Sequence, residues 1–315
     1  TETSDSDGDG IGDSSDAFPD DPERQFLGLI EALQGLADQS LLNCIENQTQ
    51  GMQSAGELSS LNCAHRDVRS LEGIQGFTNL AVLNIEGVQT EDFSPLSGLS
   101  KLIELRISWG GCCAGAGKDL SELADLKSLQ RLDANGANIK DISSLVGLTS
   151  LRYLNIGWNQ ITDLTPLGEM RGIIELNLQN SGLTSVPNFG FANTLRDLRL
   201  GENAITSLEG LPSMPALRYI DVSNSQVADI AGLSGNLSLQ NIDVRNARLK
   251  AITLSDLPEL NSLGLSDNQI ESVRFSNLDN LNRLDLNDNM MTGFSGLETL
   301  TNLRDLSMRG NVIRD

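Results

Sequence analysis

Residue types that catalysis, nucleic-acid binding or membrane insertion would require are scarce in this sequence. There is one histidine among 315 residues, which disfavours His-based acid–base chemistry and a His-rich metal site. The 22 basic residues are outnumbered by 43 acidic ones, and the net charge of -21 argues against binding to nucleic-acid phosphates. No apolar stretch approaches the ~20 residues needed to cross a bilayer, so no membrane span is predicted. Neither a Ser/His/Asp arrangement nor a phosphate-binding loop is present, and we expect no enzyme.

An acidic leader occupies residues 1–24, with nine acids and one base. Its oxygen-bearing side chains fall at positions 1, 3, 5, 9 and 12 of a calcium-loop template. These positions hold Asp5, Asp7, Asp9, Asp13 and Asp16. Gly10 stands where such a loop turns sharply, and the carbonyl of Ile11 would supply position 7. The leader is therefore predicted to bind calcium; the alternative is a solvated acidic linker.

The run from Asp5 to Pro22 resembles a thrombospondin type 3 repeat, a calcium-binding module of extracellular proteins. It departs from a helix-loop-helix calcium hand in two ways: Asp16 replaces the bidentate Glu, and no helix precedes Asp5. The resemblance implies that Asp16, Asp20 and Asp21 contribute to a second calcium ion.

A leucine-rich unit recurs twelve times from Leu58 to the end of the chain. The spacing is 22 residues, with one unit of 27 and two of 21. In each unit apolar residues alternate with polar ones, as at Leu154 and Ile156, which predicts a short strand buried on one face. Stacked units share one core and one parallel sheet. Residues 58–315 are thus predicted to form an α/β fold, a leucine-rich repeat solenoid with a concave parallel sheet.

The return segment Asp163-Leu164-Thr165-Pro166-Leu167 makes this repeat similar to the 22-residue bacterial type of the internalins. The resemblance covers residues 58–315. It implies a bacterial, secreted or cell-surface protein that binds a partner.

Residues 25–57 precede the first repeat and are predicted to form a helical N-terminal cap. The helical spacing is carried by Phe26, Leu29, Ile30 and Leu33, and after Asp38 by Leu41, Leu42 and Ile45. The last repeat has no corresponding cap. We therefore expect that the natural chain continues beyond Asp315 or that another molecule covers this end, which would permit an oligomer.

The four cysteines form two sequence pairs. Cys63 takes an inward strand position in the first repeat, and Cys44 lies on the expected cap helix, so a disulfide is predicted, with two buried thiols as the alternative. Cys112 and Cys113 are adjacent in the Gly-rich insertion of the 27-residue unit. We expect a vicinal disulfide there, with free thiols as the alternative.

The large aromatic residues and several arginines fall at exposed strand or strand-exit positions of the repeat. Such side chains dominate binding hot spots. This predicted partner-binding set is Arg106, Trp109, Arg131, Tyr153, Trp158, Arg199 and Tyr219. The leading interpretation is an extracellular module that recognises a protein or glycan through its concave face. The alternative is a stiff spacer in a larger calcium-dependent surface protein.

Overall fold

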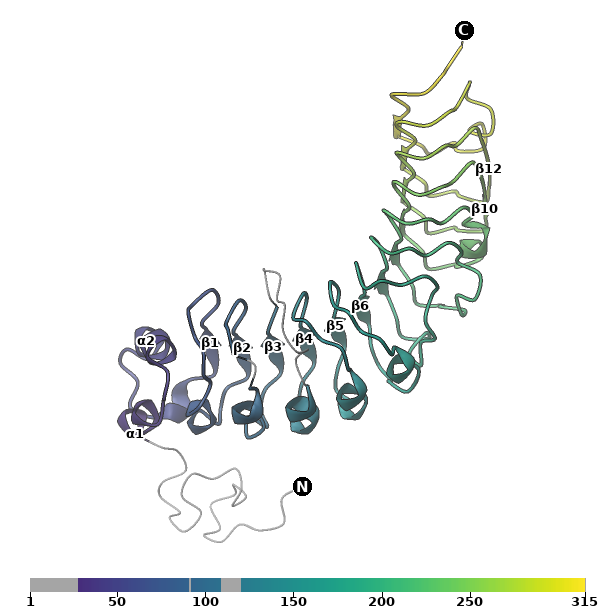
Figure 1. Cartoon of the computed structure of the whole chain (residues 1–315). Helices are drawn as coiled ribbons and strands as arrows, with labels where there is room; N and C mark the ends of the chain where they lie inside the picture. Colours follow the sequence, from purple (N-terminus) through teal and green to yellow (C-terminus); the bar gives the residue numbers. More distant parts are fainter. Residues whose placement is uncertain (1–27, 91, 109–119, 315) are drawn as a thin grey trace. The chain divides into compact units, whose positions relative to one another are not determined.

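The computed structural model describes residues 28–90, 92–108 and 120–314, and it divides into two compact units (Figure 1). The first unit holds the described residues up to Leu154 together with Ile161–Asp163. The second holds Asn155–Gln160 and the chain from Leu164 onward. Several predicted residues lie outside the described part of the chain. They are Asp5, Asp7, Asp9, Ile11, Asp13, Asp16, Asp20, Asp21, Trp109, Cys112 and Cys113.

Two short α-helices stand before the first repeat, as the apolar spacing predicted. Helix α1 spans Leu29–Gln34 and α2 spans Gln39–Gln48, which buries Leu41, Cys44 and Ile45. Asp38 caps α2, because one of its carboxylate oxygens accepts from the backbone N–H groups of Ser40 and Leu41 at 2.8 and 2.9 Å. The cap residue thereby fixes where α2 begins.

Asp38 and a disulfide tie these helices to the first repeat. The second carboxylate oxygen of Asp38 accepts from the N–H groups of Arg69 and Ser70 at 2.7 and 3.2 Å. Burial raises the pKa of Asp38, but the backbone donors outweigh burial and the net pKa is lowered. Cys44 of α2 is bonded to Cys63, 19 residues further on. The structure thus contains the pairing predicted for these two cysteines.

The strands of the first unit run parallel and pair in sequence order, from β1 through β4. Each middle residue is buried and faces the interior, as Leu61 and Leu83 do. The strands are β1 (Ser60–Asn62), β2 (Val82–Asn84), β3 (Glu104–Arg106) and β4 (Arg131–Asp133), with β5 (Tyr153–Asn155) at the division between units. The 3-10 helix η1 (Ala55–Glu57) precedes β1, and the return segments that follow β1 to β4 form η2 (Ile74–Gly76), η3 (Ser94–Leu96), η4 (Ser121–Asp125) and η5 (Ser143–Gly147). The predicted leucine-rich repeat solenoid is confirmed.

The second unit continues the same pattern. Its front strands are β6 (Glu175–Asn177), β7 (Asp197–Arg199), β8 (Tyr219–Asp221), β9 (Asn241–Asp243), β11 (Ser262–Gly264), β13 (Arg283–Asp285) and β14 (Asp305–Ser307). They are parallel and pair in that order. Two return segments are 3-10 helices, η6 (Thr165–Gly168) and η7 (Ala231–Leu233).

The two 21-residue repeats differ from the others in their return segments. Here the chain forms strands, β10 (Ala251–Ser255) and β12 (Ser272–Ser276), which pair in parallel as a separate two-stranded sheet. A strand advances about 3.3 Å per residue and a 3-10 helix about 2.0 Å. A coil that is one residue short therefore closes with an extended return segment.

A column of buried asparagines satisfies backbone groups at the turns. The amide nitrogen of Asn203 donates to the carbonyls of Leu178 and Leu200, both at 2.8 Å. Its amide oxygen accepts from Ser181 and Leu183 of the preceding coil at 2.9 and 3.0 Å. Asn203 therefore also serves the coil in which Ser181 replaces asparagine.

The residue before this column adopts a left-handed backbone in every described repeat. Asparagine, aspartate and glycine tolerate that conformation best. The members are His65, Gly87, Gly136, Trp158, Asn180, Glu202, Asn224, Asn246, Asp267, Asp288 and Gly310. Most follow this preference, and Trp158 is the bulkiest exception.

The core consists of aliphatic side chains from successive coils, but apolar side chains at the last repeat are exposed. Leu306, Val312 and Ile313 have exposed fractions of 40%, 52% and 38%. Earlier strand positions such as Leu263 are 1% exposed. That another molecule covers this end stays a prediction.

Candidate binding surface

The side chains that point outward from the front strands form a continuous surface in each unit, which we call the strand face. Within each front strand before β14, the first and third residues point outward and the middle one is buried, as the pattern of β9 illustrates. The residue two positions beyond each strand belongs to the same face. Three columns of side chains are thereby presented to solvent at fixed spacing.

On the first unit, the predicted arginines are held by one glutamate. The Nε of Arg106 donates to Glu104 at 2.7 Å, and the Nε of Arg131 lies 3.6 Å from the same carboxylate oxygen. The guanidinium carbon of Arg131 lies 3.5 Å from the ring centroid of Tyr153, a cation–π contact. The structure thus brings three of the predicted residues together in one cluster.

The second unit repeats the combination of arginine, carboxylate and tyrosine. Arg199 donates to Asp197 at 3.1 Å, and its guanidinium carbon lies 5.5 Å from the ring centroid of Tyr219. Burial, followed by the negative charges of Asp221 and Asp243, raises the pKa of Tyr219 to about 12. Tyr219 is therefore neutral at physiological pH and is held beside a fixed positive charge.

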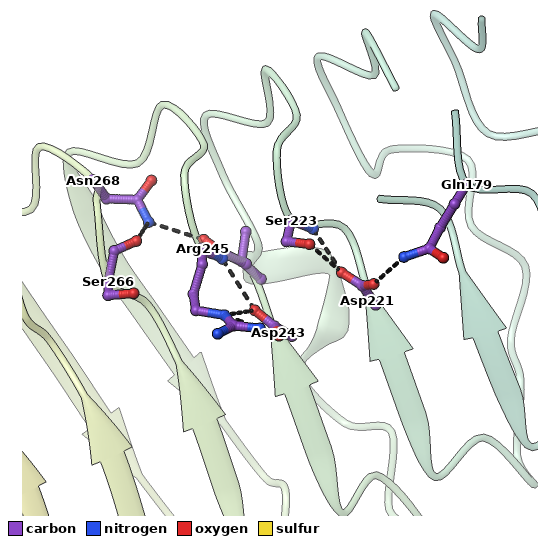
Figure 2. A network of polar contacts seen from close by, with 8 residues as sticks. Gln179, Asp221, Ser223, Asp243, Arg245, Ser266 and Asn268 are labelled. Carbon is purple, nitrogen blue, oxygen red and sulfur yellow. Dashed lines mark hydrogen bonds and ion pairs between the residues drawn. The ribbon is translucent and has the colours of Figure 1, made fainter. Parts of the chain in front are cut away.

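Asp221 is the centre of a polar network that crosses an intervening strand (Figure 2). Its carboxylate accepts from the hydroxyl and the N–H of Ser223 at 2.6 and 2.9 Å, and from Nε2 of Gln179 at 3.0 Å. Gln179 follows β6 and Asp221 ends β8, so the amide reaches over Gly201, which follows β7. A Cβ at Gly201 would lie 3.1 Å from Oδ2 of Asp221 and from Oγ of Ser223. Glycine therefore leaves the path open.

Arg245 and Asp243 form the tightest ion pair of this surface. The Nε of Arg245 donates to both carboxylate oxygens at 2.8 and 3.1 Å, and a terminal nitrogen lies 2.5 Å from Oδ2 (Figure 2). The same aspartate raises the pKa of Arg245 further above its ordinary value. The guanidinium is consequently fixed in position on the strand face.

A groove of about 390 Å³ lies over β11 on the second unit. Its rim carries charged residues from the strands on either side, including Asp243, Arg245, Arg283 and Asp285. A second depression, of about 480 Å³, shares Arg245 and is lined otherwise by the Ser, Asn and Asp side chains of the adjoining turns. The two depressions adjoin at Arg245.

Trp158 occupies the left-handed turn position and is about half exposed. Its φ is 58° and its exposed fraction is 52%. Its backbone N–H donates to the carbonyl of Gln179 at 2.7 Å, so the turn itself is well ordered. Trp109 belongs to the same repeat position and lies outside the described residues.

Reading the sequence alone missed several members of this surface, above all Gln179, Ser223 and Arg245. Each stands two residues beyond a strand. The alternation of outward and inward side chains continues past the end of the strand, and its next outward position identifies these residues. Asp221 and Asp243 are third strand residues, which the repeat register also places on this face.

Within residues 28–90, 92–108 and 120–314, no group of three or more His, Cys, Asp or Glu side chains is arranged to hold a metal ion. No helix in the same ranges combines the length and apolar character needed to cross a bilayer.

Comparison with known proteins supports the fold. Residues 118–169 and 193–235 match the family Leucine Rich repeats (2 copies). The fold is a leucine-rich repeat solenoid. The comparisons indicate no enzyme family, and a search of curated proteins gives no match.

Two solved structures illustrate the likeness. An internalin (inlF) from Listeria monocytogenes is 26% identical with a TM-score of 0.68, and the match covers 90% of this chain and 92% of the internalin. A leucine-rich repeat protein of Leptospira interrogans is 20% identical with a TM-score of 0.61, covering 79% of this chain and 72% of that protein. The first supports an internalin-like leucine-rich repeat protein, and the second shows the shared fold alone.

Proposed function

We propose that this protein is a secreted or cell-surface binding module that recognises a protein partner through its strand face and the left-handed turns that follow the strands. The single observation that carries the proposal is the exposed indole of Trp158 on a left-handed backbone. Placing a bulky L-residue in this conformation costs roughly 1–2 kcal/mol. The fold itself does not require tryptophan here, since other repeats use Asn, Asp or Gly at the same position.

The chain itself leaves 52% of Trp158 exposed, which is a large apolar area for a partner to cover. A large apolar side chain that stays half exposed on an unfavourable backbone conformation supports a role in contact with another molecule. Tryptophan is also the side chain most enriched at binding hot spots.

The arginine–tyrosine clusters support the same proposal. Arg131 lies against Tyr153 and Arg199 against Tyr219, and both arginines have a carboxylate neighbour. Side chains that are already ordered lose less conformational entropy on association. These clusters present charged and aromatic groups at low entropic cost to a partner.

The test compares binding of the intact chain with that of Trp158→Ala and Tyr219→Ala, using immobilised panels of cell-surface proteins and of glycans. We expect binding to at least one protein, and a loss of roughly tenfold or more in affinity for each variant. Leu237→Ala is a matched control, because Leu237 is 62% exposed outside the strands. Binding that is unaltered in all three variants would favour a stiff spacer, and binding confined to glycans would overturn the protein partner.

We also propose that the acidic leader binds calcium through Asp5, Asp7, Asp9, Asp13 and Asp16. The proposal is supported by the spacing of these carboxylates in the sequence. Isothermal titration of the chain with calcium chloride should show binding that Asp7→Asn together with Asp9→Asn weakens. Equal calcium affinity in the double variant would refute the assignment.

A further inference from the structure

The groove over β11 exists because every outward side chain of this strand segment is small. The outward positions are Ser262, Gly264 and Ser266, whereas the neighbouring strand segments carry Asn, Asp and Arg at their corresponding positions. Gly264 lies at the centre, paired with Asp243 on one side and Asp285 on the other. The groove thus runs between two walls of larger polar residues.

The backbone does not require glycine at residue 264. Its φ lies outside the left-handed region, and a Cβ there would lie 3.4 Å from Asp243 Oδ1 and 3.7 Å from Arg245 Cγ, which are ordinary contacts. Gly201 on the same face is different, because a Cβ there would crowd polar oxygens at 3.1 Å. Glycine in a strand weakens it and marks places where a ligand approaches the backbone closely. The absence of a side chain at Gly264 therefore points to an occupant.

The charges on the two walls are not equally satisfied. Asp243 has both carboxylate oxygens engaged by Arg245. Asp285 accepts the backbone N–H of Asn287 at 3.1 Å, and in the described part of the chain no cationic side chain lies within 4 Å of it. Arg283 is 3.8 Å from Asp305, and both of these side chains are more than two-thirds exposed. Among the described residues, Asp285 is thus a groove carboxylate without a cationic neighbour.

We propose that this groove receives a lysine or arginine side chain of the protein partner. The aliphatic stem lies over the backbone of Gly264, and the cationic group reaches Asp285. The residues that line the groove include three aspartates and two arginines, so its own charge is -1 and the complementary charge is positive. The net charge of -21 over the whole chain attracts the same kind of partner. This inference rests on the proposed function, because it specifies a side chain of that partner.

The test uses a capped pentapeptide, acetyl-Gly-Gly-Lys-Gly-Gly-amide, as a probe of the intact chain. Binding is followed by the backbone amide signals of residues 262–266 and of Asp285 in two-dimensional nuclear magnetic resonance. A peptide with norleucine in place of lysine keeps the stem and removes the charge. We expect the lysine peptide to shift these signals, and the norleucine peptide to need an about threefold higher concentration for the same shift.

Two variants locate the site. Asp285→Asn should weaken binding about threefold, as expected for a partly exposed ion pair, and Gly264→Leu should abolish it by filling the groove. Glu175→Gln removes the same charge from an exposed position on β6 and should change nothing. If Gly264→Leu fails to fold, the peptide affinities of Asp285→Asn and Glu175→Gln still test whether the peptide binds at the groove.

Equal weakening by Asp285→Asn and Glu175→Gln would overturn the inference, because it would show unspecific attraction to an acidic protein. Equal shifts from the norleucine peptide would also overturn it. The assay contains no natural partner, so its failure leaves the Trp158→Ala result standing. Conversely, if Trp158→Ala leaves binding unaltered, as expected for a stiff spacer, the outcome of the peptide titration is not affected.

Discussion

Replacing Asn203 by alanine gives the sharpest test of how the repeats are held together. The side chain is 5% exposed, and its amide nitrogen contacts the carbonyls of Leu178, Leu200 and Gly201. An NH2 group has two protons, so these contacts amount to two full bonds. The amide oxygen accepts two more from Ser181 and Leu183.

Four buried hydrogen bonds at about 1 kcal/mol each predict that Asn203→Ala lowers the free energy of unfolding by about 4 kcal/mol. The measurement is urea denaturation followed by far-ultraviolet circular dichroism. Asn282→Ala is the matched control, because Asn282 donates one bond of 3.0 Å to Asn280 near the surface. It should cost less than about 1 kcal/mol. Equal losses in the two variants would refute the role given to the buried column.

Tyr219, Gly201 and the acidic leader each give a further measurable expectation. The folded pKa of Tyr219 is about 12 against an ordinary 10.0, so the stability it contributes is complete below pH 10 and is lost as the pH rises through 12. Ultraviolet titration of Tyr153→Phe should show one late-ionising phenol, and ionisation near pH 10 would contradict the burial argument. Gly201→Ala should lower the free energy of unfolding by about 1–2 kcal/mol, because the added Cβ crowds the carboxylate of Asp221. The control is Gly293→Ala, whose Cβ meets nothing within 4 Å, so its melting temperature should be unchanged. A calcium chelator should speed proteolysis within residues 5–23 and leave the melting of the repeats unchanged; identical cleavage with and without calcium would argue for a plain acidic linker.

The repeat period in the sequence was enough to predict the solenoid, because every coil places its aliphatic residues at the same positions. Local signals also located the first helices: Asp38 precedes α2 and caps it, as its side chain chemistry favours. The partner of Cys44 followed from the inward strand position of Cys63. These features depend on residues close in sequence or on strict periodicity.

Contacts between side chains on different coils were not predictable in the same way. Gln179 reaches Asp221, 42 residues away, only because Gly201 leaves the space between them open. The register places Arg131 beside Tyr153, but the rotamer that lays the guanidinium over the ring depends on packing. The strands β10 and β12 were also not predicted, because a spacing of 21 residues does not show whether the return segment is helical or extended.

That adaptation has a mechanical consequence for the two coils concerned. Their front edges are spaced by strand pairing at about 4.8 Å, and β10 and β12 impose the same spacing at the rear. A coil whose return segment is a 3-10 helix is wider at that segment than at its front strand. Successive coils of this kind are therefore tilted relative to one another. Adding one residue before Ala251 should therefore disrupt the pairing of β10 with β12 and tilt one coil against the next.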